Sequence, residues 1–426
     1  MPHQFIINGG KDIGGEIEVR GAKNFALKAL AAALLTKEEV VIRGLPKISD
    51  VSIMISLLEK MGSKVTRTGE RDIAIKTKEI KAMELDRKHS RRVRASIVMM
   101  GPLLSRKGEV VVPHPGGDLI GKRPINFFID AFRKMGAKVK KSDSQYRVTA
   151  KNGLKGALIF FPKVSVTGTE TVILAAVLAR GTTLIKNAAM EPEIVHLCNY
   201  LGQMGARISG AGTTTIEIQG VGELKGGIME VMPDRIEAGT FVMMGVMNNA
   251  DLTVKKCNPG HLEALWEQLE RAGAKFEIGG NWVRTIPTKG RLRSVSVQTH
   301  EYPGFATDLQ PIYTLLMTQA SGICVVHEPI FEGRLFFTDL LSRMGASIIM
   351  CDPHRVTVKG PTNLIAKQIE SPDIRAGIAL ILAAIKARGE SVINNAEIID
   401  RGYEKIEERL RKIGVDIKRR KLKISS

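Results

Sequence analysis

The chain has 426 residues, of which 44% are apolar and 25% are charged, a composition typical of a soluble globular protein that excludes a disordered or fibrous one. Lysine and arginine outnumber aspartate and glutamate by 63 to 44, and the net charge of +19 indicates an anionic partner. No apolar run approaches the ~20 residues that span a bilayer, and the N-terminus lacks the pattern of a secretion signal.

One phrase recurs six times along the chain: a helix end, then glycine, a small residue and the start of a strand. The copies are LEKMGSKV at 58–65, FRKMGAKV at 132–139, GQMGARI at 202–208, LERAGAKF at 269–276, LSRMGASI at 341–348 and LRKIGVDI at 410–417. Their glycines, at 62, 136, 205, 273, 345 and 414, are spaced by 68 to 74 residues. Glycine in this place predicts a residue of positive φ just after each helix.

A second phrase keeps the same period. It is an aliphatic helix that leads into a strand, as in LAAALLTKEEVVI near the start of the chain and LAAIKARGESVI near its end. Each period therefore holds at least two helices and several strands, more than one solenoid repeat of about 20–50 residues. Six such units predict an α/β fold of two similar domains, each with three repeats in pseudo-threefold symmetry.

The helices of this second phrase begin at polar residues. Their predicted starts are Lys23-Asn24, Arg94-Ala95-Ser96, Ser165, Asp234-Arg235, Thr307-Asp308 and Ser371-Pro372-Asp373-Ile374-Arg375. Ser371 before Pro372 predicts an N-cap and N1 pair, and Thr307 predicts a comparable cap. Helix N-termini attract phosphate and carboxylate, so six ends at one period indicate an anion-binding centre if symmetry turns them inward. Taken singly, they are ordinary caps.

A glycine-rich segment, residues 114–124, joins a predicted strand to a predicted helix with Pro124 in its first turn. The segment nearly matches the nucleotide-binding pattern GxxxxGK[ST], but Arg123 stands where Mg²⁺ binding needs a hydroxyl. We interpret it as a loop that presents Asp118 and Arg123 to an anionic ligand; the alternative is a plain glycine turn.

Other cofactor patterns are missing from the sequence. It has no HxxxH pair, no dinucleotide-binding GxGxxG after a strand, and no CxxC spacing among its four cysteines. Two tryptophans and five tyrosines are too few for a base-stacking RNA surface. We expect no metal, no cofactor and neither a nucleic-acid nor a membrane partner, in a reducing cytoplasm.

Specific motifs make the chain similar, from end to end, to the enolpyruvyl transferase family, and within it to the UDP-N-acetylglucosamine 1-carboxyvinyltransferases of peptidoglycan synthesis. The motifs are Gly21-Ala22-Lys23-Asn24, Arg94-Ala95-Ser96, the 116–124 loop, Lys163-Val164-Ser165-Val166, Asn187-Ala188-Ala189, Glu191-Pro192-Glu193-Ile194-Val195, Pro233-Asp234-Arg235-Ile236-Glu237, Thr307-Asp308, Phe331-Glu332 with Arg334, Ser342-Arg343-Met344-Gly345-Ala346, Asp373 with Arg375, and Asp400-Arg401-Gly402-Tyr403-Glu404.

The resemblance implies two domains of three βαβαββ-type units each, with the active site in the cleft between them. It assigns residues 1–21 plus 233–426 to a discontinuous C-terminal domain and residues 22–232 to an N-terminal domain. It also implies a cytoplasmic enzyme that catalyses the first committed step of peptidoglycan synthesis.

The substrates implied by the resemblance are phosphoenolpyruvate and UDP-N-acetylglucosamine, both of which are anions. Lys23, Arg123 and Arg401 are expected to bind phosphoenolpyruvate, assisted by Arg334 and Arg375. Asn24 and Asp373 are further implied ligands, and Arg94 is expected to contact both phosphoenolpyruvate and the sugar nucleotide. Asp308 is the candidate general base near the sugar hydroxyl. The residues expected to bind the sugar nucleotide are Pro124, Ile125, Asn126, Phe127, Lys163, Ser165, Val166, Thr167 and Ile330.

The chain departs from the family at several positions. Asp118 replaces a usual cysteine, so we expect a carboxylic acid as the C3 proton donor and insensitivity to the cysteine-alkylating epoxide fosfomycin. Asn126 replaces Asp and Thr167 replaces Gly in the expected nucleotide site. Lys28 replaces Pro and Phe25 replaces Ala in the first helix. We interpret both changes as structural; the alternative is that Phe25, beside Asn24, crowds the cleft.

Three alternatives stay open at this point. The sister enzyme that uses shikimate 3-phosphate shares fold and chemistry, but its Ser-Lys-Ser and Gly-Asn-Ala-Gly-Thr runs are not in this sequence. A non-catalytic sugar-nucleotide-binding paralogue and a nucleic-acid-binding protein are the others. Retention of the whole cationic set, Lys23 to Arg401, together with Asp308 and Asp373, favours an enzyme.

Overall fold

The computed structural model describes residues 3–114, 116, 120–121 and 123–422, and its internal contacts divide the chain into two units. The C-terminal unit joins residues 1–20 to residues 233–426, and the N-terminal unit runs from Gly21 to Met232. The division differs from the predicted domains in two places. Gly21 belongs to the N-terminal unit, and Ile120 and Gly121 of the glycine-rich loop group with the C-terminal unit.

The N-terminal unit contains helices α1 (Lys23–Ala32), α2 (Ser49–Lys60), α3 (Arg87–Arg92), α4 (Met100–Lys107), α5 (Asn126–Lys134), α6 (Val166–Ala176) and α7 (Pro192–Gln203), with short 3₁₀ helices η1 (Ala33–Leu35) and η2 (Arg94–Met99). Its strands are β3 (Glu39–Arg43), β4 (Lys64–Arg67), β5 (Ile73–Lys76), β6 (Glu109–Pro113), β7 (Lys138–Lys141), β8 (Gln145–Thr149), β9 (Leu158–Phe160), β10 (Thr182–Lys186), β11 (Arg207–Ser209), β12 (Thr215–Gln219) and β13 (Gly227–Glu230).

The C-terminal unit contains α8 (Arg235–Met247), α9 (Glu263–Arg271), α10 (Gln310–Met317), α11 (Thr338–Arg343), α12 (Ile374–Lys386), α13 (Ala396–Ile399) and α14 (Ile406–Arg411), with η3 (Pro259–His261), η4 (Thr307–Leu309) and η5 (Arg334–Phe337). Its strands are β1 (His3–Gly9), β2 (Gly15–Glu18), β14 (Leu252–Lys255), β15 (Lys275–Ile278), β16 (Trp282–Ile286), β17 (Val297–Gln298), β18 (Gly322–His327), β19 (Ser347–Asp352), β20 (Arg355–Gly360), β21 (Gln368–Glu370), β22 (Gly389–Asn394) and β23 (Asp416–Lys421).

The sheets of the described residues repeat one pattern. Read from one edge, the four-stranded sheets are β13-β3-β5-β4, β9-β10-β12-β11, β2-β14-β16-β15, β17-β18-β20-β19 and β21-β22-β1-β23. In each, the first pair is parallel and the other two pairs are antiparallel. In the sixth sheet, β6-β8-β7, a single parallel bridge between Glu84 and Val111 takes the place of the edge strand. This common order confirms the six predicted repeats.

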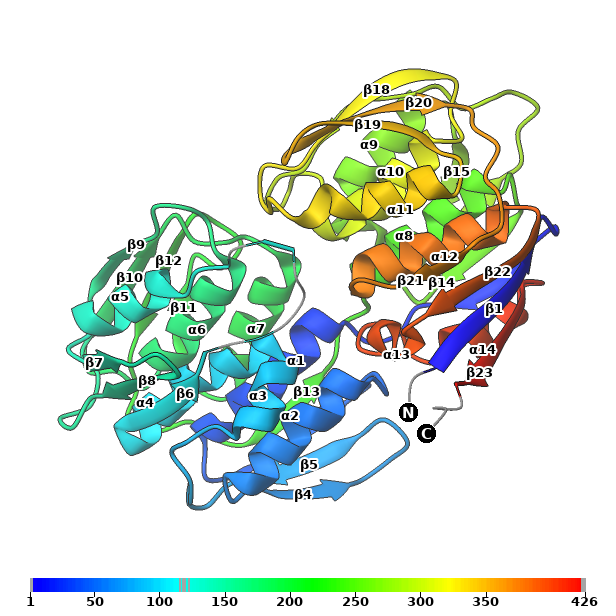
Figure 1. Cartoon of the computed structure of the whole chain (residues 1–426). Helices are drawn as coiled ribbons and strands as arrows, with labels where there is room; N and C mark the ends of the chain where they lie inside the picture. The colour runs from blue at the N-terminus through cyan, green and yellow to red at the C-terminus, as the bar shows by residue number, and fades with distance from the viewer. Residues whose placement is uncertain (1–2, 115, 117–119, 122, 423–426) are drawn as a thin grey trace. The chain divides into compact units, whose positions relative to one another are not determined.

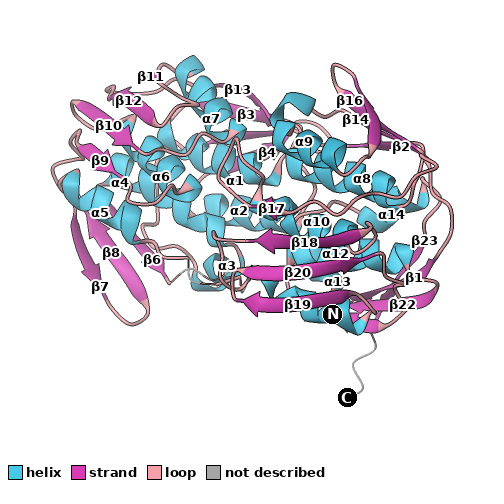
Figure 2. Ribbon diagram, turned by 90° about the horizontal axis from the view of Figure 1, so that it is seen from above, coloured by secondary structure: helices cyan, strands magenta, loops and turns pink. Residues whose placement is uncertain are grey.

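Two kinds of helix alternate within the repeats. Helices α1, α6, α8, α10 and α12 are buried on nearly every side, and an all-round apolar helix is stable only inside a core. Helices such as α5 and α9 instead bury one stripe and expose the other. Within each unit the sheets lie to the outside of the buried helices (Figure 1). Figure 2 shows one such sheet, in which β18, β20 and β19 lie side by side.

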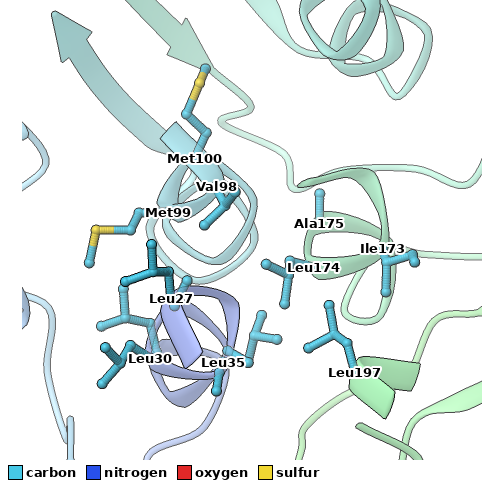
Figure 3. Packing of buried hydrophobic residues seen from close by; sticks show 14 of the residues in the cluster. Leu27, Leu30, Leu35, Val98, Met99, Met100, Ile173, Leu174, Ala175 and Leu197 are labelled. Carbon is cyan, nitrogen blue, oxygen red and sulfur yellow. The ribbon is translucent and has the colours of Figure 1, made fainter. Parts of the chain in front are cut away.

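Each unit has its own core of aliphatic side chains. In the N-terminal unit, one buried cluster includes Leu27 and Leu30 of α1, Val98 of η2, Leu174 of α6 and Leu197 of α7 (Figure 3). All five residues are fully or almost fully buried. Burying a leucine-sized side chain contributes roughly 1.5–3 kcal/mol, so this packing holds the site-bearing helices in place.

The six repeat glycines adopt the predicted conformation. Their φ angles are +97° at Gly62, +91° at Gly136, +103° at Gly205, +84° at Gly273, and +95° at Gly345 and Gly414. In all six the N–H of the glycine closes the last helical turn by donating to the carbonyl three residues back. The left-handed residue then turns the chain from each helix into the next strand.

Three local predictions are wrong. The cap of α12 is Asp373, not Ser371, because its carboxylate accepts from two free N–H groups, those of Arg375 and Ala376. Thr307 does not cap a helix; its hydroxyl donates to Glu328 instead. Pro124 precedes α5, which begins at Asn126. Among the described residues, no helix is long and apolar enough to cross a membrane.

Candidate active site

A partly buried carboxylate with two buried arginines forms the charged centre of the C-terminal unit. Asp308 Oδ2 accepts from Arg375 Nη2 at 2.8 Å and from its Nε at 3.0 Å, and Oδ1 accepts from Arg334 Nη1 at 3.0 Å. The Arg375 contact is the two-pronged geometry that suits a guanidinium and a carboxylate. Both guanidinium side chains are at most 9% exposed, whereas Asp308 keeps 23%. The predicted site residues Asp308, Arg334 and Arg375 are therefore brought together.

Each of these side chains lies at a helix start. Asp308 belongs to η4, Arg334 opens η5, and Arg375 lies in the first turn of α12 beside its cap Asp373. The ring of Tyr403 lies 5.9 Å from the Arg375 guanidinium, and its hydroxyl is 3.0 Å from that of Thr240. The packed ring and the capped helix restrict the rotamers of Arg375, so the guanidinium is held before any ligand arrives.

The electrostatics of this centre favour the charged forms. Burial alone would raise the pKa of Asp308, but the charges of Arg375 and Arg334 outweigh it, so the pKa lies well below its usual range. Burial opposes the charge of Arg375 too, yet Asp308 raises the Arg375 pKa. Burial likewise raises the pKa of the Tyr403 hydroxyl to about 12. At neutral pH the centre therefore holds one carboxylate and two guanidinium charges, an excess of positive charge.

Glu328 anchors the segment that carries Ile330. Its side chain is fully buried, and its Oε1 accepts from the N–H groups of Ile330 at 3.0 Å and Phe331 at 3.1 Å. Its Oε2 accepts from the Thr307 hydroxyl at 2.6 Å. One carboxylate thus ties the segment before Arg334 to the start of η4, next to Asp308.

Arg401 lies in the turn after α13. Its N–H donates to the Ile398 carbonyl at 3.3 Å, and its side chain is half-buried. The preceding residue, Asp400, accepts from both terminal nitrogens of Arg419, at 2.6 and 2.8 Å. This ion pair fixes the turn that presents Arg401.

In the N-terminal unit, Lys23 is the first residue of α1 and is 8% exposed. Its Nζ lies 2.8 Å from the carboxylate of Asp50, at the start of α2. Asn24 follows in the same turn and is half-buried. The ion pair holds the Lys23 ammonium group at the helix N-terminus, where the helix dipole also favours an anion.

Arg94 and Arg123 are close to each other in the same unit. The Arg94 guanidinium donates to the backbone carbonyl of Arg123, and both residues are half-buried. Burial, with the charge of Arg123 adding to it, lowers the pKa of Arg94 to about 10. Two like charges held this close repel each other, so an anion between them is favoured.

The expected sugar-nucleotide contacts lie on two helix starts. Ser165 caps α6 by accepting from Gly168 N–H at 3.1 Å, with Lys163 exposed before it and Val166 and Thr167 in the first turn. The residues at and before the start of α5 are Pro124 and Asn126, which are exposed, Phe127, which is half-buried, and Ile125, which is buried.

Phe25 lies in the core, which agrees with the structural interpretation and not with the alternative that it crowds the cleft. Its side chain is fully buried, with its ring 4.6 Å from that of His196 in an edge-on contact. The structure therefore places this departure from the family in the core. Asp118, the expected proton donor, lies outside the described residues.

Sequence reasoning missed the residues that hold the site in place. Asp50 pairs with Lys23, Tyr403 packs against Arg375, and Glu328 anchors the backbone of Ile330. These three residues come from neighbouring elements whose proximity no local pattern reveals. Tyr403 carried a signal, because it falls in the motif Asp400-Arg401-Gly402-Tyr403-Glu404. In the described part of the chain, no group of three or more His, Cys, Asp or Glu residues could hold a metal ion.

Solved structures with this architecture are enolpyruvyl transferases. NikO from Streptomyces tendae superposes with a TM-score of 0.89 at 23% identity, over 98% of this chain and 99% of its own. An EPSP synthase from Acinetobacter baumannii gives 0.76 at 18% identity, over 98% and 100%. These likenesses establish the enolpyruvyl transferase fold.

The chain belongs to the EPSP synthase (3-phosphoshikimate 1-carboxyvinyltransferase) family, whose model matches residues 7–410. Among individual relatives, a UDP-N-acetylglucosamine 1-carboxyvinyltransferase from Solibacter usitatus is 45% identical over 98% of this chain and 99% of the relative. Proteins with the same name from Acidobacterium capsulatum and, as form 1, from Carboxydothermus hydrogenoformans are each 42% identical, over 98% of this chain and 96% and 98% of their own.

Proposed function

We propose that this chain transfers the enolpyruvyl group of phosphoenolpyruvate to the 3-hydroxyl of UDP-N-acetylglucosamine, with release of phosphate, in the cytoplasm. The observation that carries this proposal is the full-length similarity to UDP-N-acetylglucosamine 1-carboxyvinyltransferases at 41–45% identity. The cationic groups of both units agree with two anionic substrates.

The donor is small and carries a phosphate and a carboxylate. We assign Lys23, Arg123 and Arg401 to phosphoenolpyruvate, with Arg334 and Arg375 assisting. Guanidinium groups bind such oxyanions through two parallel hydrogen bonds. Because Lys23, Arg334 and Arg375 are already held by Asp50 and Asp308, little ordering remains to be done when the donor binds.

The acceptor is assigned to the starts of α5 and α6. Arg94, the 123–127 segment, Lys163, Ser165, Val166 and Thr167 bind the nucleotide and its diphosphate, and Ile330 contacts the sugar. The free N–H groups of a helix start and a nearby lysine suit a diphosphate. Asn126 lacks the negative charge of the Asp that is usual in the family, and Thr167 is as neutral as the Gly it replaces. Neither substitution therefore reduces the positive potential of this region.

The reaction is an addition followed by an elimination. In the addition, the sugar 3-oxygen forms a bond to C2 of the donor, C3 gains a proton, and the hydroxyl proton passes to a base. In the elimination, the C2–O bond to phosphate breaks, C3 loses a proton, and the double bond forms again. Positive side chains stabilise the charge that develops on the carboxylate and phosphate oxygens.

Two carboxyl groups are assigned to the proton transfers. Asp308 is the candidate base for the sugar hydroxyl, and Asp118 is the candidate donor to C3. With both arginines on it, Asp308 is a weak base, since its pKa is lowered. Its basicity therefore rises when the donor carboxylate takes up part of the charge of Arg334 and Arg375.

Two other functions are less well supported. The matching family model is named after the shikimate 3-phosphate reaction, but the solved EPSP synthase above shares only 18% sequence identity with this chain. A sugar-nucleotide-binding protein without catalysis would have no need for the donor-binding cations. The retained set, including Arg334 and Arg375 on Asp308, favours an enzyme.

Phosphate release from phosphoenolpyruvate, with and without UDP-N-acetylglucosamine, tests the proposal. We expect release only with both substrates present. Shikimate 3-phosphate in place of the sugar nucleotide tests the sister reaction, and release with it alone would overturn the assignment. Tight sugar-nucleotide binding without any release would identify the non-catalytic paralogue.

Arg375→Lys tests the site itself. The substitution keeps the charge but loses the two-pronged contact, so we expect kcat/KM to fall about 100-fold, roughly 3 kcal/mol. Arg355→Lys is the matched control, because Arg355 forms an exposed pair with Asp352 at 2.7 Å. Equal activity of the two variants would remove Arg375 from the proposed site.

A further inference from the structure

The ion pair between Lys28 and Glu170 lies within the apolar core of the N-terminal unit. Lys28 lies in the middle of α1 among alanines and leucines and is 6% exposed. Its Nζ is 3.3 Å from Oε2 of Glu170 in α6, which is 1% exposed. Burying two charges costs free energy that their attraction only partly offsets, so packing alone does not explain this pair.

The pair joins two helices just below their functional ends. Lys28 follows Asn24 by four residues, and Glu170 follows Val166 by four, so each charge lies one turn below a proposed ligand on the same side of its helix. The first turn of α1 carries Lys23 and Asn24, and the start of α6 carries Ser165 to Thr167. The ion pair therefore connects the two helix starts at a depth of about 5.4 Å, one helical turn.

Other charged groups act on Glu170 from the start of α7. Burial raises the pKa of Glu170 to about 7; Lys28 opposes the rise, and Glu193 and Glu191 add to it. The carboxylate thus has one positive and two negative neighbours. Its ionisation, and with it the attraction to Lys28, changes near neutral pH.

We propose that Lys28 and Glu170 are a positioning pair for the transferase reaction, which fixes the distance between the starts of α1 and α6 and so between donor-binding and acceptor-binding residues. This inference rests on the proposed function. The pair touches neither substrate; it acts through the helices that carry the ligands.

The proposal predicts the direction in which KM for the sugar nucleotide changes with pH. A glutamate whose pKa is raised on folding is protonated in the folded state up to about pH 7. As the pH falls through this value, Glu170 loses its charge and Lys28 loses its partner. We expect KM for UDP-N-acetylglucosamine to rise about five-fold from pH 8 to pH 6, with a smaller change in kcat, because geometry and not chemistry is altered.

The decisive variant removes both charges. Lys28→Met with Glu170→Leu replaces the pair by apolar side chains, a change that buried pairs often tolerate without loss of stability. We expect KM about five-fold higher than wild type at pH 8, no further rise at pH 6, and kcat within about two-fold. Glu170→Gln alone, which keeps the shape, should show the same flat profile; thermal unfolding checks that each variant is folded.

The matched control is Glu109→Gln with Arg147→Gln, an exposed ion pair between β6 and β8 of the same unit. It should keep the wild-type KM and pH profile. A double core variant with wild-type KM and the wild-type pH dependence would overturn the inference and leave the pair purely structural.

The outcome for the pair is separable from that for the reaction. Calorimetric titration of UDP-N-acetylglucosamine into wild type and the double variant, at pH 6 and pH 8, measures positioning without turnover. If wild type releases no phosphate, the proposed function fails. If affinity for the sugar nucleotide does not depend on the pair at either pH, the positioning role fails.

Discussion

Asp308 and its two arginines show how strongly neighbours determine the chemistry of one carboxyl group. Burial alone would raise the pKa of this acid, whereas the charges of Arg375 and Arg334 lower it well below its usual range. The sequence identified all three residues as site candidates, since each falls in a specific motif. It could not place Arg375 on Asp308, because 67 residues separate them and only the packing of α12 beside α10 brings them together.

Asp308→Asn should destabilise the protein. The two guanidinium groups would lose their anionic partner, at a cost of about 2–3 kcal/mol. Because the folded pKa is lowered, the contribution of Asp308 is present above its unfolded value near 3.8 and is lost only as the pH falls through the folded value. Urea unfolding should therefore give the same difference between wild type and variant at pH 7 and pH 5. A difference that vanishes at pH 5 would contradict this.

Asp118 removes the thiol that a cysteine-alkylating epoxide needs. We expect fosfomycin to leave the protein unmodified, because a carboxylate is a far weaker nucleophile than a thiolate. Asp118→Cys should become covalently modified, with a mass gain of one adduct at position 118. Intact-mass and peptide mass spectrometry measure this; an adduct at 118 in the wild-type protein would refute the expectation.

At the scale of elements, the predicted glycine conformations after the six helices are confirmed, whereas the predicted N-cap of α12 is wrong. The glycines after the six helices were predictable, because positive φ is a local demand that glycine meets at little cost. The cap of α12 was not, since Ser371 and Asp373 both suit an N-cap and the choice depends on where β21 releases the chain. Predicting residue types at helix ends is thus easier than predicting which of two neighbours forms the cap.

The end of α7 allows a matched test. Gly205 has φ +103° and Gly202 lies inside the helix, and nothing lies within 4 Å of an added Cβ at either position. Gly205→Ala should destabilise the fold by about 1 kcal/mol through backbone strain. Gly202→Ala should stabilise it by roughly 0.5–1 kcal/mol through helix propensity. Thermal or urea unfolding measures both, and equal effects of the two changes would contradict the assignment of strain.

For the whole molecule, the repeats predicted the class of fold and the number of units. The way in which the repeats share strands could not be predicted from the sequence, because several sheets contain strands from repeats that are far apart in the chain. The net charge of +19 also acts at this scale, since it sets a positive potential around the chain.

This charge should make the capture of anionic substrates depend on salt. We expect kcat/KM to fall several-fold between about 20 mM and 300 mM salt as the Debye length shortens, with kcat nearly constant. Potassium chloride and a second salt of equal ionic strength should act alike, which separates screening from specific ion binding. A kcat/KM that is unchanged over this range would show that only the local cations matter.

The way in which the sheets are closed has a consequence for synthesis on the ribosome. Strand β1 (residues 3–9) pairs with β22 and β23, which lie far along the chain at residues 389–394 and 416–421. Strand β3 waits in the same way for β13, whose residues 227–230 follow almost two hundred positions later. The N-terminal unit can therefore close as soon as Met232 is free of the exit tunnel. Strand β1 has to stay without these partners, and accessible to chaperones, until residues 389–421 have been made as well.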